Sequence, residues 1–368
     1  MPELDTTAAA PIAIDLSADC VDITRAICDI ESVSGNEKSL ADAIQVALSG
    51  FAHLEIIRDG DCVVARTDLG RAQRVVIAGH LDTVPVNGNL PTRFETVDGR
   101  DYLWGRGTVD MKAGVAVQLK LAAELIAPVV DITWIWYDHE EVSADLNGLG
   151  RLAAGHPELF VGDFAILGEP SNGHVEGGCN GNLRVELRAR GVRAHSARGW
   201  VGENAIHKIS PILERLAAYE PRQVEVEGLV YREGLNAVGV AGGVAGNVIP
   251  DEAMVHVNYR FAPSRSVAEA VEHLRELFPE FEFAVVDQAE GARPGLDARL
   301  AREFVAAVGA EARPKYGWTD VARFSALGIP AVNFGPGDPL KAHADDERVE
   351  LLQIAQTERA LRAWLSGR

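Results

Sequence analysis

The sequence contains few cysteines and no long apolar run. Its four cysteines, Cys20, Cys28, Cys62 and Cys179, are widely spaced and form no CxxC pair. This spacing argues against a zinc ribbon or a dense disulfide framework and favours buried, reduced thiols. No apolar run reaches the roughly 18 residues that a membrane helix requires, and the first 20 residues do not resemble a secretory signal. We therefore expect a cytoplasmic protein with no membrane partner.

Positive charge is also scarce. The 368 residues include 35 Lys and Arg against 54 Asp and Glu, which gives a formal net charge of −19. Nucleic acids and anionic membranes bind to basic surfaces, so neither is an expected partner. A small anionic substrate stays compatible with this charge, because local arginines and metal ions can reverse the field inside a cleft.

The chain is long enough for two domains with separate cores. Residues 16–160 alternate helix-like and strand-like patterns, which predicts a three-layer α/β domain. Between about 180 and 290 the predicted order is β-α-β-β-α-β, the ferredoxin-like arrangement. The α/β pattern then returns. The predicted boundaries are a disordered extension at 1–15, an α/β catalytic domain at 16–179 and 292–368, and an inserted α+β lid domain at 180–291.

Individual elements follow from the periodicity of apolar residues. In the catalytic domain we expect helices over 16–30, 112–126 and about 346–365, and strands over 62–67, 74–79, 131–137 and 163–168. In the lid we expect strands over 183–190, 235–241, 253–262 and 282–287, and helices over 204–219 and 266–277.

Four strand-like segments end on, or run into, a residue that can bind a metal ion. They lead to His80, to Glu140-Glu141, to Glu169 and, through a short loop, to His343, while Asp110 closes a glycine-rich turn before a helix. Each residue taken alone could be a solvated turn or a helix cap. Ligands of open α/β sheets collect outside the carboxyl ends of the strands, so the joint pattern predicts a metal centre.

The residue types favour zinc. Imidazole and carboxylate without thiolate suit Zn²⁺, with Mn²⁺ or Co²⁺ as substitutes. Two histidines and three carboxylates suffice for two ions if one carboxylate bridges them. Of the pair Glu140-Glu141, one can bind metal while the other serves as a base. Asp82 lies two residues after His80 and is placed to accept its second ring N–H or to orient a neighbouring group.

These segments resemble the M20 family of metallopeptidases and deacylases. The resemblance rests on His80-Leu81-Asp82-Thr83-Val84-Pro85, Gly105-Arg106-Gly107-Thr108-Val109-Asp110-Met111-Lys112, Glu140-Glu141 and Gly168-Glu169-Pro170. It implies that His80 and Glu169 hold one zinc ion, that Glu141 and His343 hold the other, and that Asp110 bridges them. It further implies that Glu140 is the general base and acid, that Asp82 supports His80, and that the lid forms a homodimer.

The lid contains further candidates. Residues 191–197 resemble the family's lid motif, whose histidine reaches across the dimer to the oxyanion, and this implies a catalytic role for His195. Asn247 and Arg260 resemble the residues that bind the substrate carboxylate, a task suited to the planar guanidinium. Arg193 and Thr319 are the remaining candidates for substrate binding.

Within the family, residues 176–181, 316–324 and 333–339 resemble desuccinylases of high-GC Gram-positive bacteria. This likeness implies hydrolysis of N-succinyl-LL-2,6-diaminopimelate, a small-molecule N-acyl amino acid. The better-known proteobacterial form has a Ser-Gly-Gly-Thr-Ser-Asp run where residues 316–320 stand here, so contacts of those serines do not transfer. The alternatives are another deacylase, acting on N-acetyl-ornithine or N-acetyl-citrulline, a dipeptidase or carboxypeptidase, and a metal-free binding protein. The last would lack a ligand or the base, and all six positions are present.

Overall fold

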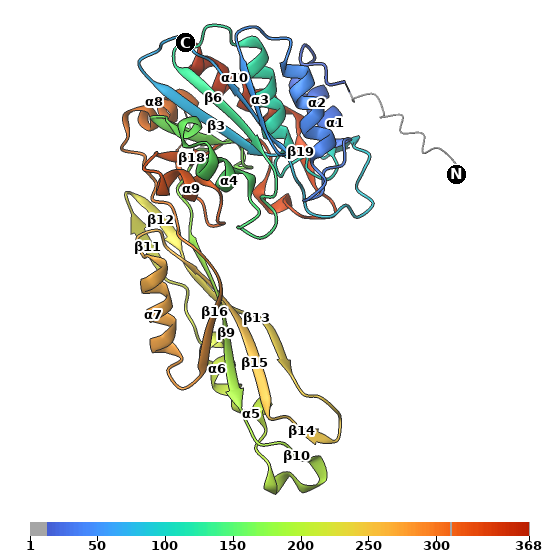
Figure 1. Cartoon of the computed structure of the whole chain (residues 1–368), viewed down its shortest axis with the longest axis vertical. Coiled ribbons are helices and arrows are strands. Elements are labelled where there is room, and N and C mark those ends of the chain that lie inside the picture. Colours follow the sequence, from blue (N-terminus) through green and yellow to red (C-terminus); the bar gives the residue numbers. More distant parts are fainter. Residues whose placement is uncertain (1–12, 310, 368) are drawn as a thin grey trace, which may run out of the picture. The chain divides into compact units, whose positions relative to one another are not determined.

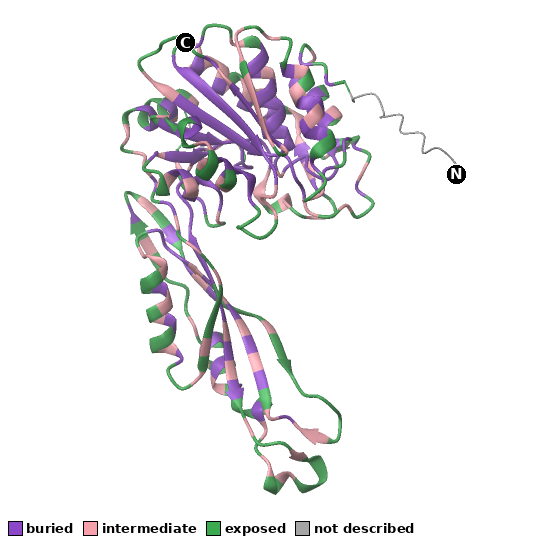
Figure 2. Cartoon of the chain, in the orientation of Figure 1, coloured by how far each residue is buried: buried purple, intermediate pink, exposed green. Residues whose placement is uncertain are grey.

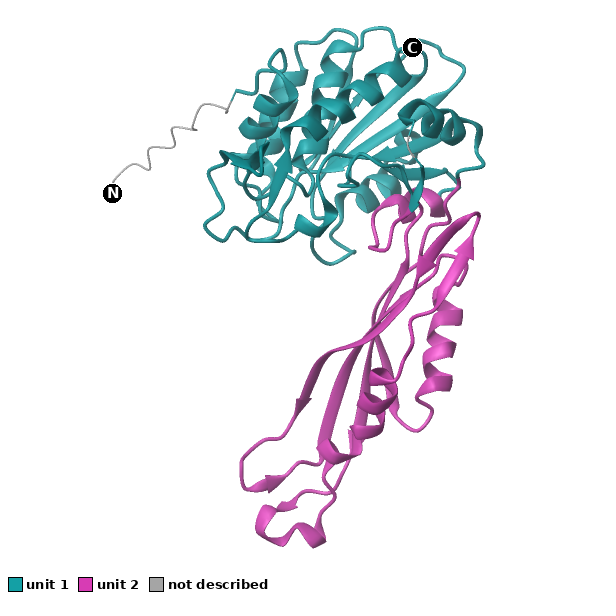
Figure 3. Ribbon diagram, turned by 180° about the vertical axis from the view of Figure 1, so that it is seen from behind, with its two compact units in different colours: residues 1–176, 296–313, 327–368 teal, residues 177–295, 314–326 magenta. Residues whose placement is uncertain are grey.

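The computed structural model describes residues 13–309 and 311–367, which form two compact units (Figure 3). Unit 1 comprises the described residues of 1–176, 296–313 and 327–368, and unit 2 comprises 177–295 and 314–326. Unit 2 therefore corresponds to the expected insertion, extended by a few residues at both ends. It also contains the separate segment 314–326, which the sequence pattern assigns to the catalytic domain.

Hydrogen bonds explain why the segment 314–326 belongs to unit 2. The main-chain N–H of Asn180 donates to the carbonyl of Lys315 (3.3 Å), and the thiol of Cys179 donates to the carbonyl of Thr319 (3.7 Å). The indole N–H of Trp318 donates to the carbonyl of Glu290 (3.1 Å). These contacts join positions up to 140 residues apart, which the periodicity of a single sequence does not reveal.

The central sheet of unit 1 has the strand order β1-β2-β6-β3-β7-β18-β8-β17. The strands are β1 (Glu55–Asp59), β2 (Cys62–Arg66), β3 (Arg74–His80), β6 (Asp131–Tyr137), β7 (Phe164–Leu167), β8 (Glu176–Gly177), β17 (Arg313–Pro314) and β18 (Ala331–Asn333). The neighbours β6, β3, β7 and β18 run parallel, so their carboxyl ends meet at one edge. A smaller sheet contains β19 (Arg348–Glu350), β5 (Arg100–Trp104) and β4 (Arg93–Val97).

Helices cover this sheet on both faces, as the α/β prediction required. The helices are α1 (Cys20–Cys28), α2 (Lys38–Leu48), α3 (Lys112–Glu124), α4 (Gly148–Gly155), α8 (Arg299–Val308) and α10 (Leu351–Leu365). All except α4 share one hydrophobic cluster with Ile77 and Trp134 of the sheet. Val76 and Ile135, which point to the other face, are also fully buried, and α4 packs against β2 and β6 (Figures 1 and 2).

Two predicted boundaries in unit 1 are wrong. The C-terminal helix is expected from about residue 346, but residues 348–350 form β19, which pairs with β5, and α10 begins at Leu351. The extension is expected to reach residue 15, but the side chain of Ile14 is buried and packs in the main hydrophobic cluster. The ordered core therefore begins before residue 15. Residues 1–12 lie outside the described part of the chain.

Unit 2 confirms the ferredoxin-like prediction. Its sheet has the antiparallel order β13-β15-β9-β16. The elements are β9 (Gly181–Arg190), α5 (Ala205–Lys208), α6 (Ser210–Ala217), β13 (Gly234–Gly242), β15 (Glu252–Phe261), α7 (Val267–Leu277) and β16 (Glu282–Ala289), with α9 (Val321–Ala326) in the separate segment. Along β15, alternate residues are buried beneath the helices (Figure 2).

Two local features of unit 2 differ from expectation. The helix predicted over 204–219 is divided into α5 and α6 at Ile209, because Pro211 has no N–H to donate to the preceding turn. An additional hairpin, β11 (Gln223–Val226) and β12 (Leu229–Arg232), precedes β13. Its turn residues, Glu227 and Gly228, both have positive φ, which suits a two-residue hairpin turn.

Across residues 13–309 and 311–367, every helix is too short or too polar to cross a bilayer.

Candidate metal centre

The carboxyl edge of the parallel strands brings the predicted ligands of unit 1 together. His80 is the last residue of β3, Glu140 and Glu141 follow β6, and Glu169 follows β7. Ligand atoms lie within 4.8 Å of one another in three groups, namely His80–Asp110–Glu169, Asp110–Glu141–His343 and His80–Glu140–Glu141. The first two groups share Asp110, and each offers three ligand atoms, the number typical of a catalytic zinc site with one position left for water or substrate.

Asp110 lies between the two histidines and presents a different oxygen to each. Its Oδ1 is 3.2 Å from Nε2 of His80, and its Oδ2 is 3.2 Å from Nε2 of His343. Nε2 of His343 is also 2.9 Å from Oε1 of Glu141, and Nε2 of His80 is 3.9 Å from Oε1 of Glu169. Two ligands of one tetrahedral Zn²⁺, each bound at about 2.0–2.1 Å, are about 3.3 Å apart. The spacing therefore fits two metal ions with Asp110 as the shared ligand.

The titration behaviour of these groups also fits a bound cation. Hydrogen bonds to Asp110 and Glu141 raise the pKa of His343 to about 10. Burial alone would lower the pKa of His80, but its hydrogen bond with Asp110 and the surrounding carboxylates raise that pKa well above its usual value. Burial would raise the pKa of Asp110, and the hydrogen bonds from His343 and His80 outweigh it and lower that pKa. The cluster thus favours positive charge, which metal ions supply when they replace these protons.

Close backbone packing explains how Glu169 reaches the edge. A side-chain Cβ at Gly114 in α3 would lie 2.1 Å from the carbonyl oxygen of Gly168, and one at Gly335 would lie 2.2 Å from the same atom. Only glycine at both positions lets α3 and the segment after β18 approach Gly168 this closely. Glu169, with 5% of its surface exposed, is thereby held with its carboxylate beside His80.

Asp82 contacts His80 through its main chain rather than its carboxylate. Nδ1–H of His80 donates to the carbonyl oxygen of Asp82 (3.0 Å), while the nearer carboxylate oxygen is 3.6 Å away. This bond leaves Nε2 directed at Asp110. The carboxylate of Asp82 accepts the N–H groups of Glu140 (2.9 Å) and Glu141 (3.0 Å). Asp82 therefore holds the main chain of Glu140 and Glu141 as well as the imidazole of His80, two contacts that the sequence spacing alone did not distinguish.

Glu347 is a buried residue of this centre that the sequence patterns did not indicate. Its Oε1 accepts the N–H groups of Val109 (2.9 Å) and Asp110 (3.1 Å), and its Oε2 accepts from Arg106 (2.8 Å). Arg106 also donates to the carbonyl of Ala344, next to His343. Glu347 thus joins the turn that carries Asp110 to the loop that carries His343. No local sequence signal reveals it, because the partners are more than 230 positions apart.

Replacing Glu347 by glutamine is expected to weaken metal binding by about 10–100-fold, the usual cost of losing a group that orients the ligands. Glu347→Ala should also lower stability by about 3–5 kcal/mol, because it leaves the guanidinium of Arg106 buried without its partner. Metal affinity by chelator competition and thermal unfolding measure the two effects. Glu303→Gln, which alters an exposed pair with Arg299, is the matched control and should change neither. Wild-type metal affinity in Glu347→Gln would contradict this prediction.

The candidates in unit 2 fall into two sets. His195 pairs with Val248 in a short ribbon of β10 (Ala194–His195) and β14 (Val248–Ile249), and the carbonyl of Asn247 accepts the N–H of Ser196 (2.9 Å). Nδ1 of His195 accepts the N–H of Ala197 (3.0 Å), and the side chain is exposed. Arg260 lies near the other end of β15, opposite Asn182. Burial and the neighbouring Arg184 lower the pKa of Arg260.

Two of the predicted substrate contacts have other partners. Nε and Nη2 of Arg193 both donate to Oδ1 of Asp251 (3.0 and 2.8 Å), which forms an exposed ion pair. Thr319 is buried, with 4% of its surface exposed, and its carbonyl accepts from Cys179. Both residues therefore make contacts within unit 2.

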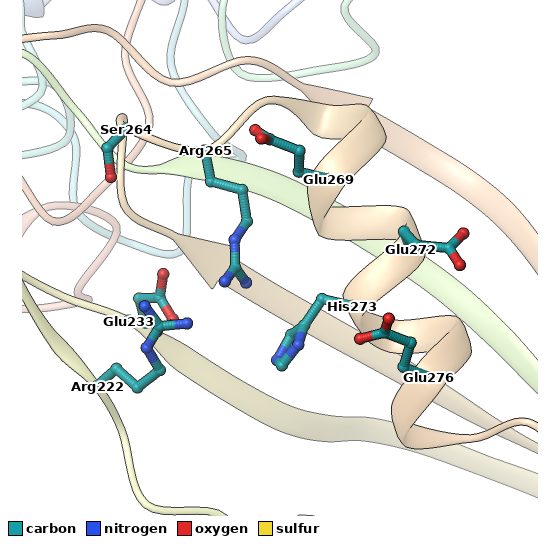
Figure 4. Close-up of a pocket in the computed structure, with 8 residues that line it drawn as sticks. All are labelled: Arg222, Glu233, Ser264, Arg265, Glu269, Glu272, His273 and Glu276. Carbon is teal, nitrogen blue, oxygen red and sulfur yellow. The ribbon is translucent and has the colours of Figure 1, made fainter.

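A cavity of about 420 Å³ in unit 2 is a poor alternative to the metal centre (Figure 4). Arg265 donates to the hydroxyl of Tyr259, and that hydroxyl donates to Glu233 (3.0 Å). Glu233 also accepts the N–H of Ala262 (3.2 Å), so both of its oxygens are bonded. Glu233 and Arg265 are therefore bonded within unit 2, and none of the three metal-ligand groups found among the described residues includes a residue that lines this cavity.

Known proteins resemble the chain over nearly its whole length. Residues 76–366 match the model of peptidase family M20/M25/M40. A succinyl-diaminopimelate desuccinylase of Corynebacterium glutamicum is 49% identical over 364 residues, which cover 96% of this chain and 98% of that protein. A Mycobacterium tuberculosis protein provisionally named succinyl-diaminopimelate desuccinylase DapE is 53% identical over 96% of this chain and 100% of its own.

Solved structures agree in fold. Aminopeptidase PepT from Bacillus cereus is 17% identical and superimposes with a TM-score of 0.76 over 96% of this chain and 98% of its own. The predicted three-layer α/β unit with an inserted α+β unit is thus confirmed at the level of the fold. The residues matched by the family model include every member of the three candidate metal-ligand groups. The chain belongs to peptidase family M20/M25/M40.

Proposed function

We propose that this protein is a metal-dependent amidohydrolase that cleaves N-succinyl-LL-2,6-diaminopimelate into succinate and LL-2,6-diaminopimelate. The observation that carries the proposal is the 49% identity to the Corynebacterium glutamicum desuccinylase over 98% of that protein. The alignment covers 96% of this chain, so the similarity extends over both the unit that carries the metal centre and the lid unit. The ligand groups around Asp110 support the metal dependence.

The metal ions in this proposal are two Zn²⁺, for which Co²⁺ or Mn²⁺ can substitute. The donors of unit 1 are imidazole and carboxylate groups, and the four described cysteines are elsewhere, all buried. His80 and Glu169 would hold one ion, Glu141 and His343 the other, and Asp110 both. When bound, the ions lower the pKa of a water molecule and polarise the amide carbonyl of the substrate.

The side chains of the protein then carry the proton. The carboxylate of Glu140 accepts a proton from the attacking water and later delivers it to the nitrogen of the departing amine. Asp82 holds Glu140 in place by accepting a hydrogen bond from the main-chain N–H of Glu140. Glu140 belongs to the group of His80 and Glu141, and to neither of the two groups that contain Asp110. This supports its role as the base rather than as a principal ligand.

Binding of the substrate is assigned to unit 2. Arg260, half-buried on the open face of the sheet, is the proposed partner of a substrate carboxylate, and Asn247 and His195 are the proposed partners of the reacting carbonyl. The distance along β15 separates these sets. Glu252, beside the ribbon of His195, and Arg260 are eight positions apart along β15, which corresponds to roughly 26 Å of strand. That exceeds the reach of one small substrate, so a homodimer in which each subunit lends His195 to its neighbour is part of the proposal.

Mixing two inactive variants tests the shared site. His195→Ala and Glu140→Gln subunits, allowed to exchange in equal amounts, should recover about one quarter of the wild-type activity. Half of the dimers are then mixed, and each mixed dimer contains one intact site in a twofold-symmetric arrangement. Activity during exchange, followed with differently tagged subunits, measures this recovery. Full exchange without any recovery would place His195 outside its neighbour's site.

Hydrolysis of N-succinyl-LL-2,6-diaminopimelate, compared with N-acetyl-ornithine and with a dipeptide, tests the reaction. Each substrate is incubated with chelator-treated and with zinc-loaded protein, and the released amine is measured. Zinc-dependent turnover of the succinyl substrate alone is the expected result. Turnover restricted to N-acetyl-ornithine or to the dipeptide would retain the metal chemistry and overturn the proposed substrate.

A further inference from the structure

The turn that carries Glu140 and Glu141 begins with an unusual backbone conformation. His139, the residue before Glu140, has a φ of 58°. Non-glycine residues adopt this left-handed region uncommonly, so surrounding contacts must hold it. Because the conformation of His139 sets the direction in which the chain leaves β6, it also sets where the next two carboxylates point.

Two buried carboxylates bind three successive N–H groups of this turn. Oε1 of Glu37 accepts the N–H of His139 (3.3 Å), and Asp82 accepts those of Glu140 and Glu141. Oε1 of Glu37 also accepts the N–H of Gly35 (2.9 Å). The turn from His139 to Glu141 is therefore anchored through its main chain. Glu37 holds it at His139, and Asp82 holds it at Glu140 and Glu141.

The buried position of the Glu37 carboxylate is energetically unfavourable by itself. Its side chain is fully buried, with 0% exposed, and burial of a carboxylate is unfavourable unless hydrogen bonds compensate it. It is the N-cap residue of α2, yet its side chain makes no capping bond to that helix. Among the described residues, its Oε2 has no hydrogen-bond partner. The contacts that compensate Glu37 are thus the N–H groups of Gly35 and His139, together with the imidazole of His139, whose Nδ1 is 3.6 Å from Oε1.

The loop that contains Glu37 also binds the end of β3. The hydroxyl of Ser34 donates to Oδ2 of Asp82 (2.6 Å), and the hydroxyl of Ser32 donates to the carbonyl of Leu81 (2.6 Å). Residues 32–37 therefore bridge the two strand ends that supply His80 on one side and Glu140 on the other. This fixes the distance between a predicted metal ligand and the predicted base.

The imidazole of His139 is hydrogen-bonded to Asp138, and its Nδ1 is also 3.6 Å from Oε1 of Glu37. The carboxylate of Asp138 accepts two bonds from Nη2 of Arg151 (2.8 and 2.9 Å) and one from the thiol of Cys62 (2.9 Å). His139 belongs to none of the three ligand groups of the described residues. Glu37 therefore contacts His139 in two ways, as the acceptor of its main-chain N–H and as an ionic partner of its imidazole, and the first of these contacts holds the turn.

We propose that Glu37 is a positioning residue for the hydrolysis: by accepting the N–H of His139 it fixes the left-handed turn that directs Glu140 at the substrate. This inference rests on the proposed function, because Glu140 is the base of that reaction. Glu37 itself touches neither substrate nor metal in this assignment. Its effect should appear in kcat, while KM and metal content stay close to those of the wild type.

A matched pair of variants isolates the hydrogen bond. Glu37→Gln retains a side-chain oxygen that can accept the N–H, and Glu37→Met fills similar space without an acceptor. We expect Glu37→Met to lower kcat by about 10–100-fold, with KM within about threefold of wild type, two metal ions bound and faster amide hydrogen exchange at His139. Glu37→Gln should retain most of kcat and the exchange protection. Glu31→Ala, an exposed glutamate nearby, is the control.

Three results would overturn the inference. They are wild-type kcat in Glu37→Met, equal loss of kcat in Glu37→Gln and Glu37→Met, and loss of bound metal in parallel with kcat. If Glu37→Met does not fold, Glu37→Ala provides the same comparison with Glu37→Gln. A wild-type protein that is inactive on the succinyl substrate would overturn the proposed function instead. The exchange rate at His139 would then still report whether Glu37 holds the turn.

Discussion

Replacing Glu140 by glutamine is expected to lower kcat by roughly 10²–10⁴-fold while the metal content stays that of the wild type. Glutamine preserves the shape of the side chain and the main-chain N–H that Asp82 accepts. It cannot take a proton from water at neutral pH, so the loss falls on the proton-transfer step. The rate of hydrolysis at saturating substrate and the metal content of the same sample measure the two quantities.

Two other glutamate variants separate the loss of a base from the loss of a metal ligand. Glu158→Gln alters an exposed glutamate with a side-chain exposure of 62%, and it should leave kcat unchanged. Glu141→Gln should lose metal, because Oε1 of Glu141 is 2.9 Å from Nε2 of His343 and both belong to one ligand group. If Glu140→Gln instead lost metal as Glu141→Gln does, Glu140 would be a ligand and the base would have to be sought elsewhere.

The sequence predicted the edge of the sheet at which these residues meet, for a physical reason. Strands buried on both faces consist almost wholly of apolar residues, as in β6, which is buried along all seven positions. Polar residues directly after such strands are therefore conspicuous. Parallel strands bring their carboxyl ends together, so the positions of His80, Glu141 and Glu169 after apolar strands suffice to group them at one edge.

The supporting residues escaped prediction because their partners are distant in sequence. Glu37 binds the turn at His139, 102 positions away, and Glu347 binds Asp110, 237 positions away. A buried glutamate near a helix start has the same local pattern as an exposed one. The role of Asp82 was only partly predictable for the same reason, since its i+2 spacing from His80 suggested an imidazole contact but not the bonds to Glu140 and Glu141.

Element boundaries failed where a long-range contact overrode the local pattern. The chain around residue 348 has helical spacing, yet it pairs with β5 because that edge is available in the folded unit. Segment 314–326 lies within an α/β-like stretch, yet hydrogen bonds at Lys315 and Thr319 attach it to unit 2. Periodicity reports which face of an element is apolar, and it does not report which neighbour covers that face.

Removing Asp110, the proposed shared ligand, should have a larger effect on metal binding than removing any other proposed ligand. Asp110→Ala deletes one oxygen 3.2 Å from His80 and another 3.2 Å from His343. We expect the bound metal to fall to one ion or fewer per subunit. Metal ions supply several kcal/mol of transition-state stabilisation, and about 1.4 kcal/mol corresponds to a tenfold change, so activity should fall about 10³-fold or more.

Variants of the ligands that serve only one of the two groups test whether Asp110 is shared. Glu169→Ala removes a ligand only from the group of His80, and His343→Ala removes one only from the group of Glu141. Each should retain about one ion, on the side that is left intact, because three ligands suffice to hold a catalytic zinc. Metal content after dialysis against limited zinc should therefore be lower in Asp110→Ala than in either of them. If Asp110→Ala retained one ion as firmly as His343→Ala does, Asp110 would serve a single metal site, and the two ligand groups would not share a bridging carboxylate.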